Sequence, residues 1–165
     1  MTQQVLYLDF DGVLHPAPVY RHHKRGIYFG VEHSGHKLFE NVSALVAALA
    51  PYPAVSVVLS TSWVHVLGYS RARSFLPEPL RSRVVGATFH SRMNKLEFAT
   101  MPRGHQVLAD ATRRGVTAWL ALDDDEDGWL TSAPIHLVLT DKTLGIQEPK
   151  VAKALTERLK IQFGS

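Results

Sequence analysis

Two aspartates, separated by one residue, follow a short apolar stretch near the start of the sequence. Residues 5–8, Val-Leu-Tyr-Leu, lead directly into Asp9, and Asp11 and Gly12 come next. If the stretch is a buried strand, Asp9 lies at its tip and Asp11 on the turn beyond it. A carboxylate at the first position can attack phosphorus and form an aspartyl-phosphate, while its neighbour protonates the leaving oxygen and later activates water. The spacing therefore predicts phosphoryl-transfer chemistry.

Hydroxyl side chains follow a second apolar stretch. Residues 54–59 lead into Ser60, Thr61 and Ser62, just before a segment of helical character. Where a strand ends and a helix opens, a hydroxyl and free backbone N–H groups can hold the same phosphate oxygens. Ser60, with Thr61 beside it, is the candidate phosphate-binding group. The alternative is that Thr61 or Ser62 only caps the helix. We predict that Trp63, which follows, lies in the core or in a pocket wall.

Five consecutive acidic residues, 123–127, follow a third apolar stretch at residues 116–122. Carboxylates crowded at the tip of a strand repel one another unless a hard cation lies among them, and Mg²⁺ takes oxygen ligands of this kind. Without these five acids the net charge of the chain would be +8 instead of +3. A basic chain with one acidic spot favours an anionic ligand, a cation bound by the acids, or both.

The elements that must position these side chains alternate along the chain. Near-continuous apolar runs, typical of parallel strands buried on both faces, occupy residues 5–8, 54–59, 116–122 and 135–139. Helical spacing of apolar residues occurs at 38–49, 102–114 and 151–163, and in interrupted form at 62–83. This order predicts an α/β fold with a doubly wound, mostly parallel sheet, in one domain of residues 1–165. Ligands of such folds bind at the carboxyl ends of the strands, where the three groups above would meet.

Residues 15–37 break this alternation. They contain Pro16, Pro18 and three glycines, with short alternating pieces that predict a β-hairpin or flap. The basic run Arg21-His22-His23-Lys24-Arg25 lies within it. Because the chain has no cysteine, we interpret its histidines as surface residues or a phosphate-contacting basic patch rather than zinc ligands.

The segment around Asp9 and Asp11 resembles the first motif of the haloacid dehalogenase (HAD) superfamily, the Asp-x-Asp-Gly-Val/Thr pattern of its phosphatases. The resemblance implies a HAD/Rossmann-like fold in which the hairpin replaces a full cap domain. It makes Asp9 the nucleophile and Asp11 the general acid and base. The Asp9 carboxylate and the Asp11 backbone carbonyl would be Mg²⁺ ligands, and Ser60 would bind phosphate as the second motif.

The third and fourth motifs of the superfamily have more than one match in this sequence. A basic residue before the helix that precedes the acidic run would neutralise the nucleophile and the phosphoryl group. Arg103 has the expected position, and Lys95 and Arg92 are its rivals. The fourth motif, a strand followed by Asp-Asp or Asp-x-x-x-Asp, assigns Asp123 to the metal. Asp124 and Asp127 compete for the second place, and we favour Asp124.

Among small members of the superfamily, the chain looks closest to the phosphatase-type domains of RNA-repair proteins. The expected function is a Mg²⁺-dependent phosphohydrolase that cleaves phosphomonoesters through an aspartyl-phosphate. One alternative is a phosphatase acting on 3′ or 5′ nucleic-acid ends, which the basic hairpin supports. The other is a non-catalytic phosphate-binding or interaction module, against which the intact Asp9 and Asp11 pair argues. The substrate is therefore a phosphorylated small molecule or a nucleic-acid end.

Composition excludes several other classes of protein. The 165 residues are 45% hydrophobic and 20% charged, which is typical of a folded globular chain. The absence of cysteine excludes a disulfide framework, a thiolate metal site and a cysteine nucleophile. No signal peptide or membrane span is recognisable, so we expect a cytoplasmic protein without membrane association. The sequence leaves the oligomeric state open.

Overall fold

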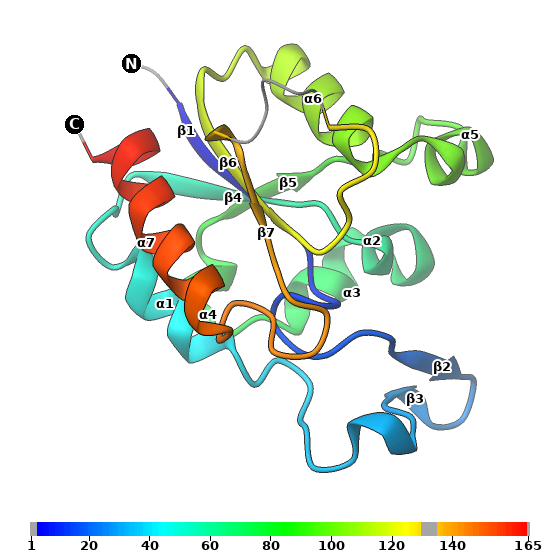
Figure 1. The fold of residues 1–165 in the computed structure, drawn as a ribbon. Coiled ribbons are helices and arrows are strands. Elements are labelled where there is room, and N and C mark those ends of the chain that lie inside the picture. Colours follow the sequence, from blue (N-terminus) through cyan, green and yellow to red (C-terminus); the bar gives the residue numbers. More distant parts are fainter. Residues whose placement is uncertain (1–2, 130–134, 165) are drawn as a thin grey trace.

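Five parallel strands form the central sheet of the computed structural model, which describes residues 3–129 and 135–164. These strands are β1 (Gln4–Leu8), β4 (Val55–Leu59), β5 (Val84–Ala87), β6 (Ala118–Asp123) and β7 (Leu137–Leu139). Their spatial order is β5-β4-β1-β6-β7 (Figure 1). The chain therefore starts in the middle of the sheet and extends it to both sides, which confirms the predicted α/β fold.

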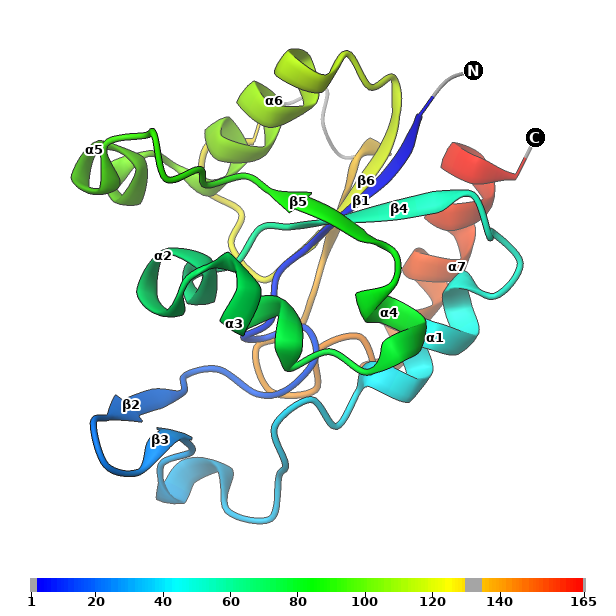
Figure 2. The same cartoon turned by 180° about the vertical axis from the view of Figure 1, so that it is seen from behind.

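Helices cover both faces of this sheet (Figures 1 and 2). They are α1 (Val42–Leu49), α2 (Ser62–Leu67), α3 (Tyr69–Ser74), α4 (Glu78–Arg81), α5 (Lys95–Thr100), α6 (Arg103–Arg114) and α7 (Pro149–Phe163). Over the part of the chain that is described, no helix has the length and hydropathy needed to cross a membrane.

The alternation of side chains along the strands divides the core into two layers. Leu6 and Leu8 pack with residues of α1, α3 and α7 on one face of the sheet. Val5 and Tyr7 point to the other face, where they pack with α6. Every second side chain of a strand points to the same face, so a strand in the middle of the sheet must be apolar throughout. This is the pattern from which the strands were predicted.

The insertion at residues 15–37 contains the predicted hairpin, with β2 (Tyr20–His22) paired antiparallel to β3 (Gly26–Tyr28). A short 3-10 helix, η1 (Val31–His33), follows it. The buried His33 ring makes a hydrogen bond of 2.8 Å to the Ala17 carbonyl, which ties the far end of the insertion to its beginning.

Several boundaries differ from the prediction. The helix predicted from residue 38 begins at Val42, because Phe39 has a φ of 59° that a right-handed helix does not contain. The last strand is shorter than the predicted 135–139. Strand β5 and helix α5 were not predicted from the sequence. β5 has only four residues, including Gly86, and Val85 is half exposed, so it lacks the apolar run of a central strand.

A charged group is buried beneath α6, away from the ends of the strands. The side chain of Asp110 is fully buried and accepts a hydrogen bond of 2.8 Å from the Tyr7 hydroxyl. Arg113 and Arg114 also donate to it, Arg114 at 2.6 Å. Burial and the Asp110 charge raise the pKa of the Tyr7 phenol far above its ordinary value. The buried carboxylate thus links α6 to β1 through the Tyr7 hydroxyl.

We expect Asp110→Asn to lower the free energy of unfolding by about 3 kcal/mol, because it leaves two guanidinium groups without their buried counter-charge. Urea unfolding followed by circular dichroism measures this change. Glu78→Gln is the matched control, since Glu78 pairs with Arg81 at the surface and its loss should cost less than about 1 kcal/mol. Equal destabilisation by the two substitutions would contradict this role of Asp110.

Candidate active site

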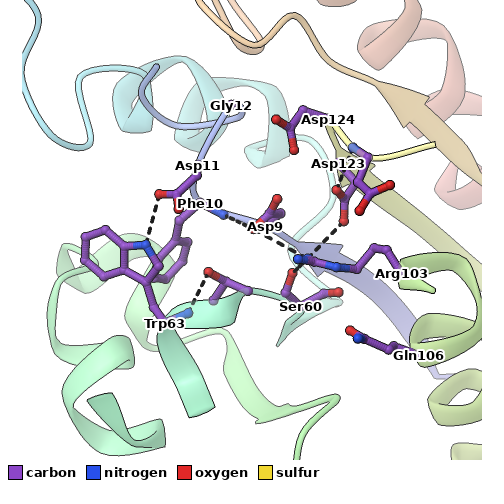
Figure 3. Close-up of polar contacts among 12 residues, drawn as sticks. Asp9, Phe10, Asp11, Gly12, Ser60, Trp63, Arg103, Gln106, Asp123 and Asp124 are labelled. Atoms are coloured by element: carbon purple, nitrogen blue, oxygen red, sulfur yellow. Dashed lines mark hydrogen bonds and ion pairs between the residues drawn. The ribbon is translucent and has the colours of Figure 1, made fainter. Parts of the chain in front are cut away.

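The carboxyl ends of three neighbouring strands bring the predicted residues together. Leu8 at the end of β1 lies beside Leu59 of β4 and Leu122 of β6. Asp9, Ser60 and Asp123 follow or complete these strands (Figure 3). The Ser60 amide donates to the Leu8 carbonyl at 2.8 Å and the Asp9 amide to the Leu122 carbonyl at 3.2 Å. The hydrogen bonds between the strands therefore continue one residue beyond the apolar runs. They fix the backbone from which these side chains project.

Arg103 joins all three of these strand ends. Its Nη1 lies 3.5 Å from Asp9 Oδ1 and 3.2 Å from Asp123 Oδ2, and it also donates to the Ser60 backbone carbonyl (Figure 3). Arg103 is the first residue of α6 and directly follows Pro102. By contrast, the rivals Lys95 and Arg92 are exposed and do not line the pocket described below. Within the described residues, neither forms an ion pair with Asp9.

The acidic loop after β6 is packed against the start of α6. The Gly104 amide donates to the Asp127 carbonyl at 2.9 Å. A Cβ on Gly104 would lie 2.4 Å from the Gly128 backbone, so only glycine permits this close approach. Asp127 thus contributes its backbone carbonyl to this packing, and its side chain is exposed. The packing brings Arg103 and Asp123 together although they lie twenty positions apart.

Burial and crowding of like charges dominate the electrostatics of the site. Burial raises the pKa of Asp9 well above its ordinary value, against the opposing charge of Arg103. Burial likewise raises the pKa of Asp123 to about 6, again with Arg103 opposing. Burial alone would lower the pKa of Arg103, but the charges of Asp9 and Asp123 outweigh it and raise that pKa. One guanidinium therefore compensates the two buried carboxylates only in part.

Three carboxylates are close enough to share a cation. Asp9, Asp123 and Asp124 each offer one oxygen, and these oxygens lie within 4.8 Å of one another. Gly12 makes room for Asp124, because a Cβ there would lie 2.3 Å from Asp124 Oδ2. The donor set is all oxygen, of the kind that Mg²⁺ prefers, and its negative charge exceeds what Arg103 supplies. These residues fit a divalent cation, whereas Asp127 does not face them.

Asp11 is held by two side chains from other elements. The Trp63 indole Nε1–H donates to Asp11 Oδ1 at 2.9 Å (Figure 3). His15 Nε2 lies 2.8 Å from the same oxygen. Because His15 Nδ1 accepts the Phe39 backbone N–H at 3.1 Å, its proton must be on Nε2, so His15 is also a donor to Asp11. Oδ1 is thus occupied, and Oδ2 accepts no hydrogen bond from the described residues. This second oxygen is the one available for proton transfer.

The two predicted hydroxyl groups have different surroundings. Ser60 is buried, and its Oγ has no hydrogen-bond partner among the described residues. A buried hydroxyl without a partner is rare and points to a missing ligand. Thr61 Oγ1 accepts the Trp63 amide at 3.3 Å, so Thr61 is the N-cap of α2. The helix-capping alternative therefore accounts for the Thr61 hydroxyl, and its phosphate binding stays a prediction.

A pocket of about 780 Å³ lies at these strand ends. Its walls carry Asp9, Asp11, Arg103 and Asp124, and a loop after β7 closes the far side. That loop contributes two contacts that the sequence did not indicate. Thr140 Oγ1 donates to the Gly12 carbonyl at 2.6 Å, and Lys142 Nζ lies 3.3 Å from Asp124 Oδ2.

Sequence reasoning also missed the contacts of His15 and Trp63 with Asp11. His15 lies four residues after Asp11, and a tight return of the chain, in which the Gly12 amide donates to the His15 carbonyl at 2.8 Å, brings the two side chains together. Trp63 was expected in the core or a pocket wall. It is buried, as expected, but its indole nitrogen reaches the site.

A known family matches most of the chain. The chain matches, over residues 5–151, the family described as the HAD domain in Swiss Army Knife RNA repair proteins. No curated protein and no solved structure matches the chain. The match spans every strand of the sheet and all of the residues gathered around Asp9. The chain therefore belongs to this family of HAD-superfamily domains.

Proposed function

We propose that the protein is a Mg²⁺-dependent phosphomonoesterase that works through an aspartyl-phosphate on Asp9. The observation that carries this proposal is the buried Asp9 carboxylate beside Arg103, with the unpartnered Ser60 hydroxyl on the neighbouring strand. A nucleophile and a cation for the phosphoryl oxygens thus line one pocket, and a free hydroxyl follows the neighbouring strand β4. A protein that only bound phosphate would not need the buried carboxylate, because that charge repels the ligand.

In the first step an Asp9 carboxylate oxygen attacks phosphorus, and the bond from phosphorus to the ester oxygen breaks. The leaving oxygen keeps the electron pair and takes a proton from Asp11 Oδ2. In the second step Asp11 accepts a proton from water, which attacks phosphorus and releases phosphate from Asp9. Arg103 and Ser60 hold the phosphoryl oxygens throughout. The bond cleaved is the same for a small phosphorylated molecule and for a nucleic-acid end.

Asp9, Asp123 and Asp124 would hold the Mg²⁺ ion. The ion supplies positive charge that offsets the repulsion between the phosphoryl group and the carboxylates. Arg103 balances only part of the charge of Asp9 and Asp123, so the residues themselves favour a cation. The Asp11 backbone carbonyl is a further proposed ligand, carried over from the family pattern.

The first test is hydrolysis of p-nitrophenyl phosphate with Mg²⁺ and with a chelator. We expect activity that the chelator abolishes and that Asp9→Asn lowers by at least about 1,000-fold, because the nucleophile is lost. Glu157→Gln, an exposed charge change on α7, is the control and should keep full activity. If the protein hydrolyses no phosphomonoester, or if Asp9→Asn remains active, the mechanism is wrong.

The two rivals for the fourth motif can be separated by Mg²⁺ titration of the same activity. Asp124→Asn should raise the Mg²⁺ concentration for half-maximal activity by about 10-fold or more, since it removes one of three carboxylates. Asp127→Asn removes the same charge three residues further on and should leave that concentration unchanged. The reverse order would assign the metal to Asp127.

Without Mg²⁺ the free energy of unfolding should fall with rising pH, and Mg²⁺ should oppose this fall. Burial raises the pKa of Asp123 to about 6, so the folded protein binds more protons than the unfolded chain between the ordinary carboxyl range and that value. Without metal, the free energy of unfolding must therefore fall as pH rises through this window. Because Mg²⁺ binds the ionised carboxylates, it should raise the melting temperature more at about pH 7 than at about pH 5. A Mg²⁺ effect independent of pH would contradict binding at these groups.

The hydrogen bonds to Asp11 predict a dependence on the leaving group. Trp63→Phe removes one of the two donors to Oδ1 and should lower kcat/KM about 10-fold for an alkyl phosphate, whose oxygen needs a proton. The loss for p-nitrophenyl phosphate should be less than about 3-fold, because nitrophenolate leaves without full protonation. Trp119→Phe, in the core on the far face of the sheet, is the matched control. Equal losses on both substrates would mean that Trp63 acts only through packing.

A further inference from the structure

A second pocket, of about 580 Å³, lies along the edge strand β5. This strand lies between α6 on one side and α2 and α3 on the other (Figure 2). We call the hollow the edge pocket. It is lined by residues of α2 and α3, by residues 85–87 and 89–91, and by Arg114 at the end of α6. Within the described part of the chain it shares no lining residue with the active-site pocket, so a ligand here would occupy a separate site.

The charged group of the edge pocket is the Arg114 guanidinium. Its Nε donates to the buried Asp110 at 2.6 Å, whereas Nη1 and Nη2 form no hydrogen bond with the residues that the structure describes. A guanidinium has five N–H donors, so the four on these two nitrogens are left for another partner. A Cβ on Gly86 would lie 2.6 Å from Nη2, so the guanidinium lies directly against the strand that lines the pocket.

Arg114 shares its counter-charge with Arg113. Both guanidinium groups pair with the fully buried Asp110 carboxylate, and the Tyr7 hydroxyl that donates to it is neutral because its pKa is raised. Two positive charges therefore face one negative charge. The Arg113 side chain is 44% exposed, so water can solvate its charge, whereas that of Arg114 is only 20% exposed. The unbalanced charge is thus least hydrated at the wall of the edge pocket.

The loop after β5 adds polar groups without adding negative charge. Arg113 Nη2 lies 3.2 Å from His90 Nε2, and since a guanidinium can only donate, His90 accepts there and carries its proton on Nδ1. The Ser91 hydroxyl also lines the pocket. Among the described residues, no acidic side chain lines it. The lining therefore offers hydrogen-bond donors together with a single cationic side chain.

Most of the remaining lining is hydrophobic. Val64 and Phe89 belong to it, and so do Tyr69 and Val85. Tyr69 is 37% exposed and Val85 is 49% exposed, although both are large hydrophobic residues. Packing within the chain therefore leaves an apolar surface beside the guanidinium. A ligand that covered it would remove this surface from water, which is favourable.

Another strand is not the occupant that β5 favours. The strand has only four residues, and its register with β4 shifts between Val57 and Val58. Short edge strands and irregularities of this kind turn an edge away from pairing with a further strand. The volume of the pocket, by contrast, lies within the range of about 300–1,000 Å³ that is usual for small-molecule sites.

We propose that the edge pocket binds a small molecule with one carboxylate and an apolar body. The carboxylate would accept from Nη1 and Nη2 of Arg114, whose planar fork matches its two oxygens. The apolar body would cover Tyr69 and Val85. One unbalanced positive charge favours a monoanion over a phosphate group, which carries nearly two negative charges at neutral pH. This site does not depend on the proposed phosphatase function.

The first test locates a probe, naphthalene-2-carboxylate, on the whole isotope-labelled chain by amide NMR. The amides of Gly68 and Gly86, which line the edge pocket, should shift along one saturating curve. The amides of Gly12 and Gly104, which contact the acidic loop of the active site, should not shift. No saturable shift at Gly68 and Gly86, or shifts at Gly12 and Gly104 alone, would overturn the proposal.

Two further probes separate the halves of the ligand. 2-Naphthylmethanol lacks the charge that Arg114 would bind, and acetate lacks the apolar body. We expect each to bind at least about 10-fold more weakly than naphthalene-2-carboxylate. Equal affinity for the alcohol would remove Arg114 from the site, and equal affinity for acetate would remove the apolar wall. Either result would contradict the proposal.

Variants test the position of the ligand by calorimetric titration with naphthalene-2-carboxylate. Val85→Glu places a negative charge on the wall of the pocket and should raise the dissociation constant at least about 10-fold. Leu96→Glu is the matched control, because it makes the same change at a side chain that is 79% exposed on α5, and its effect should be less than about 2-fold. Arg114→Lys keeps a counter-charge for Asp110 but loses the planar fork, and should raise the constant about 5-fold. Equal effects of Val85→Glu and Leu96→Glu, or no effect of Arg114→Lys, would show that the probe binds elsewhere.

Discussion

The contact of Arg103 with two buried carboxylates is the interaction on which the site depends. Asp9 and Asp123 end neighbouring strands, and their charges would repel each other in a space that excludes water. The guanidinium lies within 3.5 Å of both and is itself fixed by the start of α6. Its position requires the acidic loop to pack against Gly104. The order of the strands, the start of α6 and the conformation of the acidic loop thus together form one ion-paired cluster. The negative charge that Arg103 does not balance favours a cation.

The same arrangement explains how the site can bind an anion although it contains several acids. Arg103 lines the pocket from the start of α6, and the Ser60 hydroxyl is buried at the end of β4, whereas the metal-binding candidates follow or close β1 and β6. Asp11 stands apart and is turned toward Trp63 (Figure 3), and it also contacts His15. The residues proposed for attack, charge neutralisation and proton transfer therefore come from different elements.

Much of this architecture could be predicted from the sequence, because buried parallel strands carry an apolar signal on both faces. Each apolar run of residues 5–8, 54–59 and 116–122 marks a strand end, and a chemically active residue follows or closes each one. Contacts that depend on the return of the chain in space could not be predicted. The donors to Asp11 come from residues 15 and 63, and the His15 ring is itself bound by the backbone N–H of Phe39, whose positive φ no local pattern predicts. The edge strand β5 could not be predicted because one of its faces is partly exposed, so its sequence lacks a continuous apolar run.

The central claim is that Asp9, rather than water, attacks phosphorus first. The stereochemical course of hydrolysis at a phosphoryl group made chiral with sulfur and oxygen isotopes tests it most directly, because each in-line displacement inverts phosphorus once. Two displacements through an aspartyl-phosphate predict net retention of configuration in the released phosphate. Net inversion would show a single direct attack by water and would contradict the role assigned here to Asp9.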